Sequence, residues 1–253
     1  MTTLREIPCP LVIAHRGASA VFIENSVDAF VGAATLGADW VELDVRVSSD
    51  GTPVVHHDPH LPASDSTTST SRLVVADTPF AAFPVHVPTL VNALTACEQP
   101  GARSGRPLGV NVEIKSAAHE PGFDPSYAHL PAILAIVTEI LGPDRALISS
   151  FDLGVLRRVR QLAPDLPTAL LAIDCLDLPK VLRVASAAGS RAINPPDVYI
   201  TPTFMDAARA AGLAVYPWTV DRPERISELC DLGVDGIITN VPDVAATIID
   251  ARA

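Results

Sequence analysis

Residues 11–47 read LVIAHRGASAVFIENSVDAFVGAATLGADWVELDVRV and contain three elements in order. The apolar, β-branched run 11–14 predicts a strand, and the apolar spacing from Ser26 to Leu36 predicts a helix capped by Asn25 or Ser26. The run 40–47 predicts a second strand. Strand, helix and strand in this order are typical of a parallel sheet covered by helices.

The same alternation continues to the end of the chain. We expect eight strands and following helical segments, so a (β/α)8 TIM barrel forming a single domain over residues 1–253 is the predicted fold. A turn at 49–51 predicts a small hairpin after the second strand. An open doubly wound sheet is the alternative, but no Gly-rich dinucleotide fingerprint follows the first strand. The further strands are expected at 53–57 (the hairpin), 109–115, 146–151, 168–173, 191–194, 214–220 and 236–239, and the further helices at 129–141, 152–162, 178–188, 203–211, 222–232 and 242–251.

Two stretches interrupt this rhythm. Residues 60–72 are rich in Ser, Thr, Asp and Pro, and residues 118–127 also lack periodicity, so both are predicted to be long loops. Each would leave the carboxyl-terminal rim of a barrel, where active sites are built.

Composition narrows the class of protein. The chain has 253 residues, 48% of them apolar and 19% charged, with a formal net charge of −11. This balance indicates a globular protein and argues against nucleic acid as a partner. The amino terminus has no apolar signal region, and no run of about 18 apolar residues follows. We therefore expect a cytoplasmic protein without stable membrane insertion.

The four cysteines give no sign of a metal site. They lie far apart at 9, 97, 175 and 230, without the spacing of zinc ligands. Reduced, mostly buried thiols are expected, and zinc is not.

Two carboxylates in the second strand indicate a metal site of another kind. Glu42 and Asp44 are two residues apart, so in a strand their side chains project from the same face. Oxygen ligands suit a hard divalent cation such as Mg²⁺ or Ca²⁺, with Mn²⁺ also possible. His15 and His57 bracket the pair in sequence and are natural candidates for passing protons. The segment predicts a metal-assisted acid–base site.

More functional candidates stand at other strand ends. Glu113 and Lys115 share a face near the end of the third strand, Arg16 ends the first, and Trp218 lies near the end of the seventh. In a barrel these ends open on one mouth. Charged groups in an apolar core are costly, so their collection round a metal explains them better than stability does. Trp218 is either barrel packing or a wall of a substrate pocket.

Seven short motifs extend over most of the chain: His15-Arg16-Gly17-Ala18, Glu24-Asn25, Glu42-Leu43-Asp44-Val45, His57-Asp58, Glu113-Ile114-Lys115, Trp218-Thr219-Val220 and Gly233-Val234-Asp235-Gly236-Ile237-Ile238-Thr239. In their order and spacing they resemble the glycerophosphodiester phosphodiesterase family, which has a (β/α)8 barrel. The resemblance implies hydrolysis of a small-molecule glycerophosphodiester to glycerol 3-phosphate and an alcohol, with one divalent cation. It also implies the roles of the site residues: His15 and His57 as the acid–base pair, Glu42, Asp44 and Glu113 as metal ligands, and Arg16 and Lys115 as phosphate contacts, with Trp218 as a further candidate for substrate contact.

The chain departs from the family pattern at several positions. Ile23 replaces a frequent Pro, and His56 replaces the aromatic residue that usually precedes the catalytic His-Asp pair. Two adjacent histidines therefore compete, and His57 is preferred because Asp58 follows it. Residues 61–65 lack the usual pattern of substrate contacts, and Asn240 stands where an Asp is common.

Two rival functions keep the fold. A lysophospholipase D-like hydrolase is one, suggested by the divergent loop 60–72, although no basic amphipathic helix for membrane binding is evident. A barrel that binds a phosphorylated ligand without turnover is the other, and it would be indicated by a missing His or carboxylate. The preferred alcohol, the native metal, the oligomeric state and the choice between attack by water and a cyclic phosphate intermediate stay open.

Overall fold

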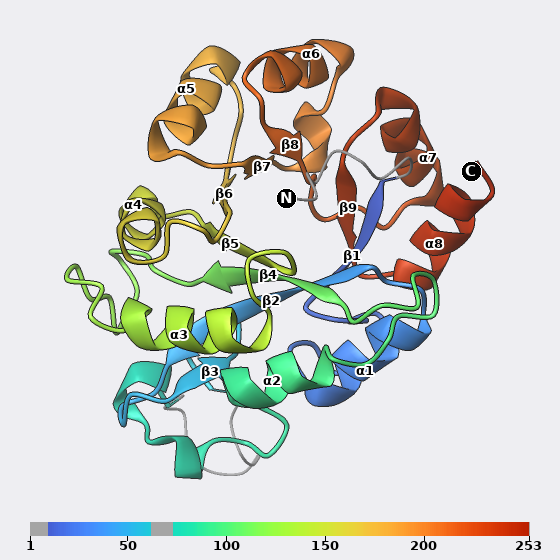
Figure 1. The fold of residues 1–253 in the computed structure, drawn as a ribbon. Coiled ribbons are helices and arrows are strands. Elements are labelled where there is room, and N and C mark those ends of the chain that lie inside the picture. Colours follow the sequence, from blue (N-terminus) through green and yellow to red (C-terminus); the bar gives the residue numbers. More distant parts are fainter. Residues whose placement is uncertain (1–9, 62–72, 253) are drawn as a thin grey trace.

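Eight parallel strands arranged in a barrel form the centre of the molecule (Figure 1). The computed structural model describes residues 10–61 and 73–252. The strand order is β8-β7-β6-β5-β4-β2-β1-β9, and β3 pairs antiparallel with β2 as the predicted hairpin. The strands are β1 Leu11–His15, β2 Trp40–Val47, β3 Pro53–Val55, β4 Gly109–Ile114, β5 Ala146–Ser150, β6 Thr168–Leu171, β7 Ala192–Asn194, β8 Ala214–Val215 and β9 Gly236–Thr239.

The barrel is closed between β8 and β9 by single hydrogen bonds instead of a regular ladder. The Ile238 N–H donates to the Pro217 carbonyl at 3.0 Å, and the Val220 N–H donates to the Ile238 carbonyl at 3.0 Å. The strand predicted over 214–220 is wrong beyond Val215. Pro217 has no N–H to offer a neighbouring strand, which ends the regular pairing there.

Helices surround the strands on the outside (Figure 1). Ser26 caps the first of them, its Oγ accepting from the Ala29 N–H at 3.1 Å. The α-helices are α1 Val27–Thr35, α2 Leu90–Ala96, α3 Leu130–Ile140, α4 Leu153–Leu162, α5 Leu178–Ala188, α6 Pro202–Ala210, α7 Pro223–Leu232 and α8 Pro242–Asp250, with 3₁₀ turns at Val75–Asp77, Phe80–Ala82 and Asp197–Tyr199.

Helix α2 was missed by the sequence analysis, which left the second strand without a helix. It has only two turns, begins at the cap residue Thr89, and buries Leu90, Ala93 and Leu94. Two turns give too short a pattern to separate a helix from a loop. With α2, every strand of the barrel proper leads to a helix.

The barrel interior is apolar at its amino-terminal end. Its lining includes Ile13, Leu147 and Ile238, together with the small side chains of Ala169 and Ala192. A second, larger core lies between the strands and the helices. Because apolar side chains fill the lower interior, polar side chains are collected at the carboxyl ends of the strands, where the described part of the site lies.

One of the two predicted long loops lies wholly within the described residues. Residues 118–127 contain no helix or strand, as predicted, while most of the predicted loop 60–72 lies outside the described residues. Among the described helices, none combines the length and apolar character needed to cross a bilayer.

Candidate active site

The three predicted carboxylate ligands lie together at the mouth of the barrel. Glu42 and Asp44 project inward from β2, and Glu113 lies on β4 directly beside Asp44 in the parallel register. One oxygen from each lies within 4.8 Å of the others. All three are buried, with relative exposures of 4%, 0% and 7%. Three buried carboxylates this close require neutralisation.

Two side-chain cations supply part of it. Lys115 Nζ lies 2.8 Å from Asp44 Oδ1 and 2.5 Å from Glu113 Oε1. Arg16 Nε lies 3.2 Å from Asp44 Oδ2, and the Arg16 backbone N–H donates to Glu42 Oε2 at 3.0 Å. Arg16 and Lys115, the two predicted phosphate contacts, therefore form ion pairs with carboxylates of the cluster.

The carboxylates respond differently to this environment. Burial favours the neutral form of Asp44, but the charges of Lys115 and Arg16 outweigh burial and hold its pKa below the ordinary value. Burial raises the pKa of Glu113 to about 7 against the opposing effect of Lys115. Burial and the neighbouring Asp44 raise the pKa of Glu42 well above its ordinary value. Without a bound cation, the folded protein therefore favours the neutral forms of Glu42 and Glu113 and the ionised form of Asp44.

The donor set fits a hard divalent cation. All three donors are carboxylates, and two of their buried oxygens, Asp44 Oδ1 and Glu113 Oε1, lie against the Lys115 ammonium and have no other hydrogen-bond partner among the described residues. Oxygen-only sites of this kind suit Mg²⁺, Ca²⁺ or Mn²⁺ and leave the choice among them open.

His15 lies at the end of β1 beside this cluster. Its Nε2 is 4.0 Å from Glu42 Oε2, and its Nδ1 is 2.8 Å from Asn240 Oδ1. Burial and the neighbouring Arg16 lower the pKa of His15. A neutral imidazole with one nitrogen facing the carboxylates is suited to accept a proton.

The two adjacent histidines of the hairpin have different partners. His57 Nδ1 lies 2.8 Å from Asp58 Oδ1, and His57 is close enough to Asp44 for that carboxylate to raise the imidazole pKa against the stronger lowering effect of burial. The ring of His56 instead points to the loop, with Nε2 3.1 Å from the His60 carbonyl oxygen. Of these two histidines, His57 is thus the one that interacts with Asp44, while His56 contacts the segment that follows the hairpin.

Two residues of the site had no predicted role in it. Arg46, only 9% exposed, donates from Nε to the His57 carbonyl at 2.8 Å and from Nη1 to Glu120 at 2.9 Å. Asn25 donates from Nδ2 to Asp44 Oδ2 at 2.7 Å. Arg46 follows Asp44 by two residues on the same strand, which was the signal available in the sequence.

Aromatic side chains line another part of the mouth. Trp218 donates from Nε1 to the Asn194 carbonyl at 2.8 Å, and its ring meets that of Phe151 edge to face at 5.9 Å between centroids. The hydrogen bond and the ring contact therefore hold the indole of Trp218 in place.

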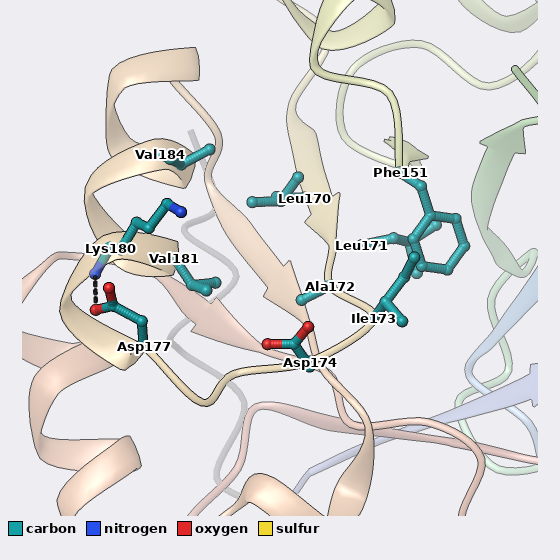
Figure 2. A pocket seen from close by; sticks show the side chains of 10 residues that line it. All are labelled: Phe151, Leu170, Leu171, Ala172, Ile173, Asp174, Asp177, Lys180, Val181 and Val184. Carbon is teal, nitrogen blue, oxygen red and sulfur yellow. Dashed lines mark hydrogen bonds between the residues drawn. The ribbon is translucent and has the colours of Figure 1, made fainter. Parts of the chain in front are cut away.

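An apolar groove begins at Phe151 and extends outward between β6 and α5 (Figure 2). Its volume is about 320 Å³. Phe151, Leu171 and Ile173 lie at one end in Figure 2, and Lys180 on α5 and its N-cap residue Asp177 lie at the other. The side chains of the groove are those of Phe151, Leu170, Leu171, Ala172, Ile173, Asp174, Asp177, Lys180, Val181 and Val184.

The sequence and fold of the chain are similar to those of one family of known proteins. The family model described as "Glycerophosphoryl diester phosphodiesterase family" matches residues 15–244. A glycerophosphodiester phosphodiesterase of Caldanaerobacter subterraneus is 31% identical over 250 residues, covering 94% of this chain and 97% of that protein. Among solved structures, a Silicibacter pomeroyi protein assigned to the same enzyme class has a TM-score of 0.84 at 29% identity, covering 99% of this chain and 96% of the other.

A second solved structure shares the fold. It is an Oleispira antarctica phosphodiesterase in complex with the product sn-glycerol-3-phosphate, with a TM-score of 0.81 at 24% identity, and the match covers 96% of this chain and 97% of that one. The family model and the relatives extend over nearly the whole barrel, including every predicted site residue. The chain therefore belongs to the glycerophosphoryl diester phosphodiesterase family.

Proposed function

We propose that this protein hydrolyses glycerophosphodiesters to glycerol 3-phosphate and an alcohol, with a divalent cation held by Glu42, Asp44 and Glu113 and with His15 and His57 as the acid–base pair. The observation that supports this most directly is the buried carboxylate cluster at the barrel mouth, with His15 beside Glu42 and His57 near Asp44. Family membership supports the substrate class.

Each group answers a need of phosphodiester cleavage. The nucleophile must lose a proton, the leaving alkoxide must gain one, and the phosphoryl oxygens need neutralisation. His15 and His57 serve the two proton transfers, each worth about 10²–10⁴-fold. A bound divalent cation would supply electrostatic stabilisation of phosphoryl oxygens. Arg16 and Lys115 lie against the carboxylates, so an anionic phosphate entering the cluster meets both cations.

A product assay tests this proposal. The chelated protein is given glycerophosphocholine with Mg²⁺, Ca²⁺ or Mn²⁺ in turn, and released glycerol 3-phosphate is measured. We expect turnover only after metal is restored, and losses of about 10²-fold or more in His15→Ala and His57→Ala. His119→Ala, an exposed histidine outside the site, is the matched control. Full turnover by His15→Ala or by the chelated protein would refute the assignment.

The apolar groove favours a second candidate substrate, a lysophospholipid. The groove starts at the aromatic side chain of Phe151, and Ile173, which lines it, is 76% exposed. An acyl chain on the leaving alcohol could cover such surface. Rates on lysophosphatidylcholine and glycerophosphocholine, measured side by side, separate the two. Turnover of either diester excludes a barrel that only binds.

A further inference from the structure

His15 is the first member of a hydrogen-bonded chain that ends outside the metal cluster. Its Nδ1 lies 2.8 Å from Asn240 Oδ1, and Asn240 Nδ2 donates to Asp221 Oδ2 at 2.7 Å. Asp221 lies in the segment after β8, and Asn240 directly follows β9. Three segments that are distant in sequence therefore meet behind the imidazole.

The direction of each hydrogen bond follows from the chemistry of Asp221. A carboxylate only accepts, so the amide NH₂ of Asn240 must face it and the amide oxygen must face His15. Asp221 also accepts from the Asn240 backbone N–H at 2.8 Å and from Thr239 Oγ at 3.1 Å, so both of its oxygens are used. The amide of Asn240 cannot turn over without placing its oxygen against a carboxylate.

The fixed amide in turn fixes the imidazole. Because Asn240 presents an acceptor, Nδ1 of neutral His15 must carry the proton, which leaves the lone pair on Nε2. Nε2 is the nitrogen that faces Glu42, at 4.0 Å. Ser19 Oγ lies 2.8 Å from the same Asn240 oxygen and 2.8 Å from the His15 carbonyl oxygen, which further restricts the amide.

We propose that Asp221 and Asn240 are positioning residues that hold His15 in the Nδ1-protonated tautomer, with Nε2 free to exchange a proton with substrate. The consequence for catalysis rests on the proposed function of His15. The assignment of the tautomer does not, because it follows from the hydrogen bonds alone. Within this series of hydrogen-bonded side chains the negative charge lies on Asp221, which is separated from the imidazole by the neutral amide of Asn240.

Exchanging the two side chains tests this directionality. In Asp221→Asn, the new amide must keep its oxygen toward Thr239 and its NH₂ then meets the NH₂ of Asn240. Asn240 must turn over, and His15 is left with the wrong tautomer. In Asn240→Asp, two carboxylates face each other across the former 2.7 Å contact. In the double exchange Asp221→Asn/Asn240→Asp, the new Asn donates to the new Asp, which still accepts from His15, so the chain of donors is restored.

The expected result is a loss that the double exchange reverses. Asp221→Asn should lower kcat by about 10–100-fold with little change in KM, as for other groups that orient a catalytic histidine. Asn240→Asp should lose both activity and thermal stability, and the double exchange should recover most of each. Asp206→Asn, whose side chain is 80% exposed on α6, is the matched control and should leave kcat unchanged.

A spectroscopic readout separates this inference from the proposed function. ¹⁵N NMR of the metal-free protein at about pH 8, with the His15 signals assigned by their loss in His15→Ala, reports which ring nitrogen carries the proton. We expect Nδ1–H in the wild type and Nε2–H in Asp221→Asn, and Asp221 is exposed enough for this variant to fold even if Asn240→Asp does not. An unchanged tautomer in Asp221→Asn, or a folded double exchange no better than Asn240→Asp alone, would overturn the inference. If no diester is turned over, the proposed function fails while the tautomer measurement still decides the inference.

Discussion

Removing the Lys115 ammonium is the sharpest perturbation of the carboxylate cluster. Lys115→Met keeps the length and apolar character of the side chain but deletes the cation that lies 2.8 Å from Asp44 and 2.5 Å from Glu113. The lysine side chain is 11% exposed and that of Asp44 is 0% exposed, so solvent replaces little of the lost interaction. Three buried carboxylates are then left facing Arg16 as the remaining side-chain cation within ion-pair distance of Asp44 in the described structure.

The cost follows from the burial of these charges. Deleting one partner of a buried ion pair costs about 3–5 kcal/mol, because the other charge stays uncompensated. For a chain of this size each kcal/mol moves Tm by about 2–4 °C, so Lys115→Met without metal should melt roughly 6–20 °C lower. Protonation of Glu113, whose pKa burial already raises to about 7, offsets part of this cost at acidic pH. The loss should therefore be larger at pH 8 than at pH 6.

A divalent cation should narrow the gap in Tm between Lys115→Met and the wild type. At about 100 times its Kd, a ligand stabilises the folded state by about 2.7 kcal/mol, and the more negative variant site should bind a cation more tightly than the wild type. Differential scanning calorimetry with chelator and with Mg²⁺ or Ca²⁺ measures both effects. Lys180→Met, the same substitution at an exposed lysine, is the control. Equal melting of Lys115→Met and wild type without metal, or a gap that metal leaves unchanged, would refute the reasoning.

Three other predictions concern the same site. The metal-free protein should lose stability as the pH rises from about 4.5 to about 7. Over this range Glu113 ionises in the unfolded chain, where its pKa is near the ordinary 4.5, but stays protonated in the folded protein, where its pKa is about 7. Urea denaturation across this range measures the effect, and a flat profile contradicts it. Metal binding near pH 6 should release protons from Glu113 and Glu42, which calorimetry in two buffers of different ionisation enthalpy detects. Arg46→Met should lower kcat by about 10–100-fold, because the His57 carbonyl loses its donor, with partial recovery in Arg46→Lys; kinetics with unchanged kcat would show that the hairpin needs no such support.

The sequence predicted most elements because period and chain order suffice for a parallel barrel. Every expected strand and helix is present with bounds within two residues, except the strand over 214–220. The prediction of that strand is wrong at Pro217. The apolar residues suggested that the strand continues, but proline has no N–H for regular strand pairing. Helix α2 was not predicted, because a helix of two turns gives too little periodicity in the sequence.

The site divides in the same way. Glu42, Asp44 and Glu113 could be grouped in advance, because strand periodicity and barrel topology bring such positions together. The supporting contacts could not. Arg46 meets His57 only because the hairpin folds back, and Asp221 meets Asn240 only because β8 and β9 are neighbours at the barrel closure.

The contact between His15 and Asn240 joins residues 225 positions apart. Asn240 directly follows β9, so the hydrogen bond on the imidazole can form only when β9 has paired with β1. The orientation of the His15 ring is thus coupled to closure of the barrel, and a partly folded state with β9 undocked would lack it.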